Sequence, residues 1–289
     1  MTATPLLGVN VSQSALPGAD PVGDARQAER LGFDFVSCSD HLVGTHPTFE
    51  TWTLLAWVAA RTERVGILTD VLGLPYRSPA VLAKMAETLH RLSGGRLILG
   101  IGGGGSDGEA RAFGLDVRES RDKVDALAEA IEVLRGLWSE RAYTFHGRHF
   151  RTEAAEIEPK PDRRIPIWTG SYGPRSLAVT GRLADGWIPS FRYAPPERAG
   201  PMMDRVRRAA EEAGRHPADL TFAYNVGIRV DERADPRSFV VSGAPERCAE
   251  RLREFVALGF TAINLWPAGP DPAAQRGRLA AEVVPLLRH

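Results

Sequence analysis

Acidic and imidazole side chains follow short apolar runs in this sequence, and such groups could exchange protons with a bound substrate. The run FDFVSC (33–38) is followed at once by Ser39, Asp40 and His41. An imidazole can donate or accept a proton near neutral pH, and a neighbouring carboxylate can orient it. For this pair of residues taken alone, the plainer interpretation is favoured: Asp40 caps the next segment and His41 is an ordinary loop residue.

A further carboxylate, Asp70, lies within the apolar run RVGILTDVL (64–72). A carboxylate buried among apolar groups is unfavourable unless it is paired or faces a polar cavity. An acid at each of two neighbouring strand ends therefore makes a functional site more plausible. The alternative for Asp70 is an edge or bulge position that faces solvent.

Glycines cluster in the segment GIGGGG (100–105), which follows another apolar run. Because glycine has no Cβ, the backbone at Gly102, Gly103 and Gly104 can approach a flat ligand closely. Glycines also form ordinary turns, so ligand contact and a simple loop are equally consistent with this segment.

The segment IPIWTGSYGPRSL (165–177) predicts a strand that ends at glycine and a helix that has proline in its first turn. Backbone N–H groups at the start of such a helix lack helical partners, and the helix dipole favours an anion there. The segment therefore predicts a phosphate site, although a well-capped helix with a solvated arginine is the alternative. The candidate ligands are Gly170, Ser171, Tyr172, Gly173, Arg175 and Ser176.

The order of apolar runs predicts the fold that positions these residues. Between the runs, apolar residues recur three and four apart, as in helices. Eight alternations of strand and helix are typical of a closed (β/α)8 TIM barrel, whose chemistry gathers at the carboxyl ends of the strands. A doubly wound open sheet is the alternative, because periodicity cannot reveal closure. The predicted strands are 6–11, 33–38, 64–72, 96–102, 165–170, 184–189, 220–230 and 260–266.

One interval interrupts this alternation. We expect an insertion at about 139–164, between the fourth helix and the fifth strand, with a small hairpin at AYTFHGRHF (142–150). No linker or fixed-period repeat divides the rest, so residues 1–289 are expected to form a single domain.

Composition narrows the possible partners. The 289 residues contain 36 Lys plus Arg and 36 Asp plus Glu, which gives no basic surplus for nucleic acid. Cys38 and Cys248 lack the spacing of a metal site, and TWTLLAWVAA (51–60) is too short to cross a membrane. We therefore expect a cytoplasmic protein with a small-molecule substrate, no metal, no nucleic-acid partner and no membrane contact.

Over nearly its whole length the chain resembles the luciferase-like monooxygenase superfamily, in particular its deazaflavin-dependent branch. The most specific blocks are ERVGILTDVLGLPYRSPAVLAKMAETLHRLSGGRLILGIGGG (63–104) and PIWTGSYGPRSLAVTGRLADGWI (166–188). This resemblance implies a barrel that binds a flavin or 5-deazaflavin at its C-terminal face. It implies catalytic roles for Asp40 and His41 beside the cofactor ring, and a non-prolyl cis peptide at Asp70–Val71 behind it.

The same resemblance suggests the reaction. We expect a coenzyme F420-dependent oxidoreductase that transfers hydride to or from a small organic substrate, and we expect a homodimer. The alternatives are an FMN-dependent two-component monooxygenase and a non-catalytic flavin-binding protein. The F420 tail requires a cationic exit, for which the candidates are Arg77, Arg175 and Arg182.

The chain departs from one branch of that superfamily. The sugar-phosphate dehydrogenase members carry a glutamate after the fourth strand, where this sequence has Gly105. This difference disfavours that subgroup, with Asp107 and Glu109 as candidate replacements for the missing acid.

Overall fold

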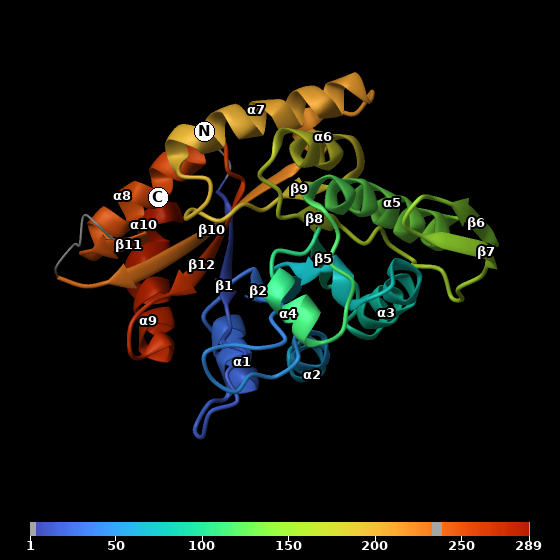
Figure 1. The fold of residues 1–289 in the computed structure, drawn as a ribbon. Coiled ribbons are helices and arrows are strands. Elements are labelled where there is room, and N and C mark those ends of the chain that lie inside the picture. The colour runs from blue at the N-terminus through green and yellow to red at the C-terminus, as the bar shows by residue number, and fades with distance from the viewer. Residues whose placement is uncertain (1–3, 233–238, 289) are drawn as a thin grey trace.

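The computed structural model describes residues 4–232 and 239–288, and within these ranges eight parallel strands close into a barrel surrounded by helices (Figure 1). Around the barrel the strand order is β1, β2, β3, β5, β8, β9, β10 and β12, and β12 pairs with β1. Their bounds are β1 Leu6–Asn10, β2 Phe35–Cys38, β3 Gly66–Thr69, β5 Leu97–Gly102, β8 Ile167–Thr169, β9 Gly186–Trp187, β10 Thr221–Val230 and β12 Ala262–Pro267.

The predicted closed barrel is confirmed, and the open-sheet alternative is wrong. Strand β9 pairs with β8 on one side and with β10 on the other, with Phe222 opposite Trp187, so this arc of the sheet has no free edge. Seven of the eight barrel strands fall within the predicted runs, and β12 ends at Pro267, one residue beyond the run 260–266. A short strand, β11 (Val240–Gly243), pairs with the far end of β10 outside the barrel.

Helices cover the outside of the barrel and bury their apolar faces against it. Proline begins α1, α3, α6, α7, α8 and α9, where its fixed φ suits the first helical turn and its missing N–H costs nothing. The bounds are α1 Pro21–Arg30, α2 Thr51–Arg61, α3 Pro79–Leu92, α4 Asp107–Ala112, α5 Ser120–Ser139, α6 Pro174–Leu183, α7 Pro196–Glu212, α8 Pro245–Leu258, α9 Pro272–Arg278 and α10 Val284–Arg288. Shorter turns are the 3-10 segments Leu74–Tyr76 and Pro217–Asp219 and the π segment Leu279–Val283.

A hairpin occupies part of the interval between α5 and β8. Strands β6 (Tyr143–His146) and β7 (Arg151–Ala155) pair antiparallel and lie beside α5 at the edge of the molecule (Figure 1). The sequence predicted the hairpin over 142–150, but its second strand begins only at Arg151. The N–H groups of Arg148, His149 and Phe150 donate to the Glu129 carboxylate at 2.8–3.0 Å, and these residues therefore form the turn.

The chain makes an irregular step after β3. The peptide bond between Asp70 and Val71 is cis, as predicted from the resemblance. The short strand β4 (Leu72–Gly73) then pairs with the end of β5, with Gly73 opposite Gly102. This step therefore brings Asp70 and Val71 to the C-terminal end of the barrel.

Among residues 4–232 and 239–288, none of the helices combines the length and the apolar content needed to span a lipid bilayer.

Candidate active site

A cavity of about 1150 Å³ opens at the C-terminal end of the barrel. Its walls come from the segments that follow β2, β3, β5, β8 and β9, and from the C-terminal parts of β10 and β12. With the exception of Arg175, the site residues predicted from the sequence line this cavity, although they come from four separate segments. They are Asp40, His41, Asp70, Val71, Gly102, Gly103, Gly104, Gly170, Ser171, Tyr172, Gly173 and Ser176.

Val71 and two glycines form one wall of the cavity. A Cβ at Gly102 would lie 3.0 Å from Cγ2 of Val71, and a Cβ at Gly170 would lie 3.2 Å from the same atom. Both distances are shorter than ordinary van der Waals contact, so the missing side chains allow Val71 to pack directly against two neighbouring strand ends. The Val71 side chain gives this wall an apolar surface, and the glycines leave room for a flat ring to contact it.

A buried polar network lies under this wall. The side-chain amides of Asn225 and Asn264 each donate to one oxygen of the Asp70 carboxylate at 2.9 Å. The Asn264 amide also lies 2.8 Å from the hydroxyl of Ser37. Sequence reasoning singled out Asp70 but missed Asn264 and Ser37. A signal existed, because an asparagine in the middle of the apolar run FTAINLW needs a buried partner.

Burial raises the pKa of the Asp70 carboxyl to about 6, and hydrogen bonds from Asn225 and Asn264 oppose this rise without cancelling it. Neutral amides stabilise the carboxylate less than a cation would, which explains why burial prevails. The side chain is only 7% exposed, so it remains shielded from water although it borders the cavity.

Asp40 contacts Arg77 and not His41. Its two carboxylate oxygens accept from Arg77 Nη1 at 2.8 Å and from Nη2 at 3.2 Å, and one of them also accepts from the backbone N–H of Gly73 at 2.9 Å. Arg77 additionally pairs with Glu50. Asp40 is thus a buried anchor that ties the loop after β2 to the segment after the cis peptide.

His41 takes its acidic partner from α4. Its Nδ1 lies 2.8 Å from Oε1 of Glu109, and the other Glu109 oxygen accepts from the N–H of Leu42 at 2.9 Å. Burial acts to raise the pKa of Glu109, but the bonds from His41 and Leu42 outweigh it and the pKa is lowered. Because an ionised carboxylate only accepts, Nδ1 carries the proton and Nε2 is left to exchange one with a ligand. Of the two replacements considered for the acid missing at Gly105, Glu109 reaches His41 while Asp107 pairs with Lys123.

The start of α6 is held rigidly at the opposite wall. The hydroxyl of Ser176 accepts from the N–H of Gly173 at 3.1 Å, and Ser171 Oγ lies 2.7 Å from the Thr180 hydroxyl. The Tyr172 hydroxyl accepts from the N–H of Ser190 at 3.0 Å. These bonds fix the loop so that the first-turn N–H groups of the helix are preorganised for an anion.

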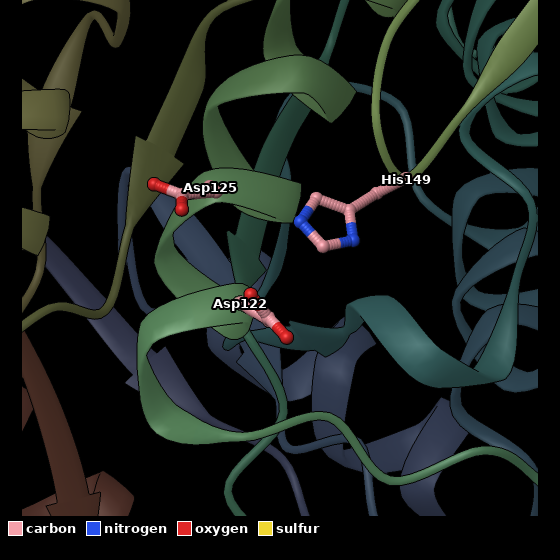
Figure 2. Close-up of side chains that lie close together, drawn as sticks. All are labelled: Asp122, Asp125 and His149. Atoms are coloured by element: carbon pink, nitrogen blue, oxygen red, sulfur yellow. The ribbon is translucent and has the colours of Figure 1, made fainter.

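Arg175 lies apart from the other predicted residues. Its guanidinium pairs with Asp125 on α5 at 2.6 Å, and its side chain is about half exposed. Figure 2 shows Asp125 and Asp122 on that helix, with the imidazole of His149 facing them from the hairpin turn. These three residues have ligand atoms within 4.8 Å of one another. Arg175 and Arg148 already compensate the two carboxylates, at 2.6 and 3.1 Å, so this cluster carries no metal assignment.

The cations that border the cavity are Lys123, Arg192 and Arg198, which the sequence analysis did not single out. Arg192 stacks over the rings of Tyr193 and Phe239. None of the arginines expected there, Arg77, Arg175 and Arg182, lines the cavity among the described residues. Arg77 and Arg175 already pair with carboxylates, which could not be read from the sequence.

Comparison with known proteins identifies the family. The model of the luciferase-like monooxygenase family matches residues 10–236. The chain belongs to this family. An F420-dependent glucose-6-phosphate dehydrogenase of Intrasporangium calvum is 30% identical, covering 91% of this chain and 92% of that protein. One of Kineococcus radiotolerans is 29% identical, covering 91% of both.

A solved structure of the same fold is similar over almost the whole chain. It is an F420-dependent secondary alcohol dehydrogenase in complex with an F420-acetone adduct, with a TM-score of 0.88 and 21% sequence identity, covering 99% of this chain and 100% of that one. This likeness supports the barrel fold of the family member described here.

The raised pKa of Asp70 predicts a pH dependence of stability. The folded state binds a proton at Asp70 up to about pH 6, whereas the unfolded chain releases it near pH 3.8. The contribution of Asp70 to the free energy of unfolding is therefore greatest below pH 3.8 and falls as the pH rises through 6. Compared with Asp70→Asn, the wild type should lose about 2 kcal/mol between pH 4 and pH 7. Urea unfolding of both proteins over this range measures the difference, and parallel curves would contradict it.

Proposed function

We propose that this protein is a coenzyme F420-dependent oxidoreductase that transfers hydride between the deazaflavin and a small organic substrate. One observation carries the proposal: a single cavity joins an apolar wall at Val71, the start of α6 and the imidazole of His41. A flat ring with a phosphate-bearing side chain needs the first two features, and a proton transfer needs the third. The names of the curated relatives, which are F420-dependent dehydrogenases, support the same cofactor.

The residues around the cavity fit this cofactor. The backbone beside Val71 is free of side chains where a ring would approach, and the first turn of α6 offers N–H groups to a phosphate. When bound, the deazaflavin supplies the carbon that gives or receives the hydride. We assign cofactor contact to Asp70, Val71, Gly102, Gly103, Gly104, Gly170, Ser171, Tyr172, Gly173 and Ser176. The Arg175 side chain is left out because it is paired with Asp125.

His41 is the proposed catalytic residue. Glu109 holds Nδ1 in its protonated form, so Nε2 can take a proton from a substrate hydroxyl or return one to a carbonyl oxygen. Asp40, which we expected to be catalytic, is proposed instead as a positioning residue. Its bonds to Arg77 and Gly73 keep the Val71 wall at a fixed place relative to the loop that carries His41.

Three cationic side chains border the cavity and could bind the anionic part of the cofactor. Lys123, Arg192 and Arg198 border the same cavity as the start of α6, and Arg192 and Arg198 have no carboxylate partner among the described residues. We propose that these side chains, and not Arg77 or Arg182, attract the acidic tail of F420.

We also propose that residues 1–289 form one domain, and that the protein acts in the cytoplasm as a homodimer. Exposed apolar side chains on the neighbouring helices α2 and α3, Trp57 and Val81, each 58% exposed, are consistent with a protein interface.

Titration of the purified protein with F420 and with FMN, followed by absorbance and fluorescence, tests the cofactor assignment. F420 should bind more tightly than FMN. Gly170→Val adds a branched side chain against Val71 and should weaken F420 binding at least tenfold. Gly277→Val is the matched control, because a Cβ there meets no atom within 4 Å. Tight FMN binding without detectable F420 binding would favour the two-component monooxygenase.

His41→Ala tests the proton-transfer role. Turnover should fall by about a hundredfold or more while F420 affinity stays unchanged, since Nε2 acts on the substrate and not on the cofactor. His146→Ala on strand β6 is the control, because its side chain is exposed and pairs with Glu153 on the neighbouring strand. Equal activity of the two variants, or lost cofactor binding in His41→Ala alone, would refute this role.

A further inference from the structure

A smaller compartment of about 470 Å³ adjoins the main cavity. The two share Ser39, His41 and Trp266 as lining residues, so His41 borders both. The compartment lies between the segments that follow β12, β1 and β2. Its position places any occupant within reach of the imidazole and beside the proposed cofactor ring.

The lining of this compartment is polar but almost uncharged. Asn10, Ser12 and Thr48 offer neutral amide and hydroxyl groups, and Pro267 and Trp266 offer apolar surface. Neither aspartate nor glutamate is among the described lining residues. The groups that can carry charge there are His41, His46 and Arg276.

Arg276 is not available to a ligand. Its side chain is 1% exposed, and its guanidinium pairs with Asp24 and donates to the Gln27 side chain at 3.0 Å. His41 is held through Nδ1 by Glu109. The third group, His46, is an exposed imidazole on the loop after β2. An anion in this compartment would therefore meet no free guanidinium or ammonium group among the described lining residues, whereas a neutral ligand needs none.

Arg192 and Arg198, which have no carboxylate partner among the described residues, lie on the other side of the barrel, together with Lys123, which pairs with Asp107. Going round from β1, the strand order places β8 opposite β1, and α6 follows β8. Lys123 is on the helix after β5, while Arg192 and Arg198 follow β9. The cavity is thus divided into a cationic side, suited to the phosphate and tail of the cofactor, and a neutral side at β12, β1 and β2.

We propose that the neutral compartment binds the substrate and that the substrate is an uncharged alcohol or carbonyl compound, not a sugar phosphate. This inference rests on the proposed function and deepens it, because it names the substrate class. The proposed substrate class differs from glucose 6-phosphate, the substrate given in the names of the curated relatives. The neutral hydrogen-bonding groups satisfy a hydroxyl or carbonyl oxygen, and Trp266 and the prolines contact its carbon skeleton.

Paired probes test the charge preference. Glucose is compared with glucose 6-phosphate, and cyclohexanol with cyclohexyl phosphate, by equilibrium binding to the F420-loaded protein and by calorimetry with the cofactor-free protein. The neutral member of a pair should bind at least tenfold more tightly. A phosphorylated member that binds as tightly as its neutral counterpart, or no binding by either neutral probe, would overturn the inference.

A variant adds an independent measurement. Thr45→Lys places an ammonium group on an exposed loop position that lines the compartment, and it should raise the affinity for the phosphorylated probes at least tenfold. Thr88→Lys, at an exposed position on α3 outside the compartment, is the control. Equal effects of the two variants would refute the assignment of the substrate to this compartment. Failure of F420 to bind would instead refute the proposed function. Calorimetry with the cofactor-free protein measures the charge preference of the compartment without F420, so the two failures can be told apart.

Discussion

The site depends on the buried ion pair between Asp40 and Arg77. Both Asp40 oxygens accept from the guanidinium, and one also accepts from the N–H of Gly73. The loop after β2 and the segment after β3 are therefore fixed to each other by a charge-assisted, bidentate contact. That contact sets where His41 lies relative to Val71, so the proposed proton-transfer group and the wall for the ring share one anchor. Loss of Arg77 would leave the buried Asp40 carboxylate without its cation, whereas loss of Asp40 would leave Arg77 with Glu50 as its remaining partner.

The charged side chains at the open end of the barrel are unevenly distributed around this anchor. The arc that begins near β5 and runs to β9 presents cations and a helix N-terminus, whereas the arc from β12 to β2 presents neutral groups. An anionic cofactor and an uncharged substrate can then be held apart without competing for the same side chains. The imidazole of His41 lies where the two regions meet, with its orientation set by Glu109.

The sequence predicted the fold and most of the candidate site, but not the partners of its residues. Alternating apolar runs and the resemblance to a known family placed Val71, the glycines and the start of α6 at one end of a barrel. The side chain that contacts His41 could not be inferred, because Glu109 lies 68 residues away and meets it only through the path of the loop after β5. Arg175 illustrates the same limit, since a carboxylate on another helix, Asp125, decides whether its charge is free.

A crystal structure of the protein with bound F420 tests the account most directly. The account predicts that the phosphate lies against the first turn of α6, that the ring packs on Val71, and that the compartment beside His41 stays open to the substrate. A phosphate bound at the β12, β1 and β2 side, or a ring that does not contact Val71, would contradict the assignment of the two sides of the cavity.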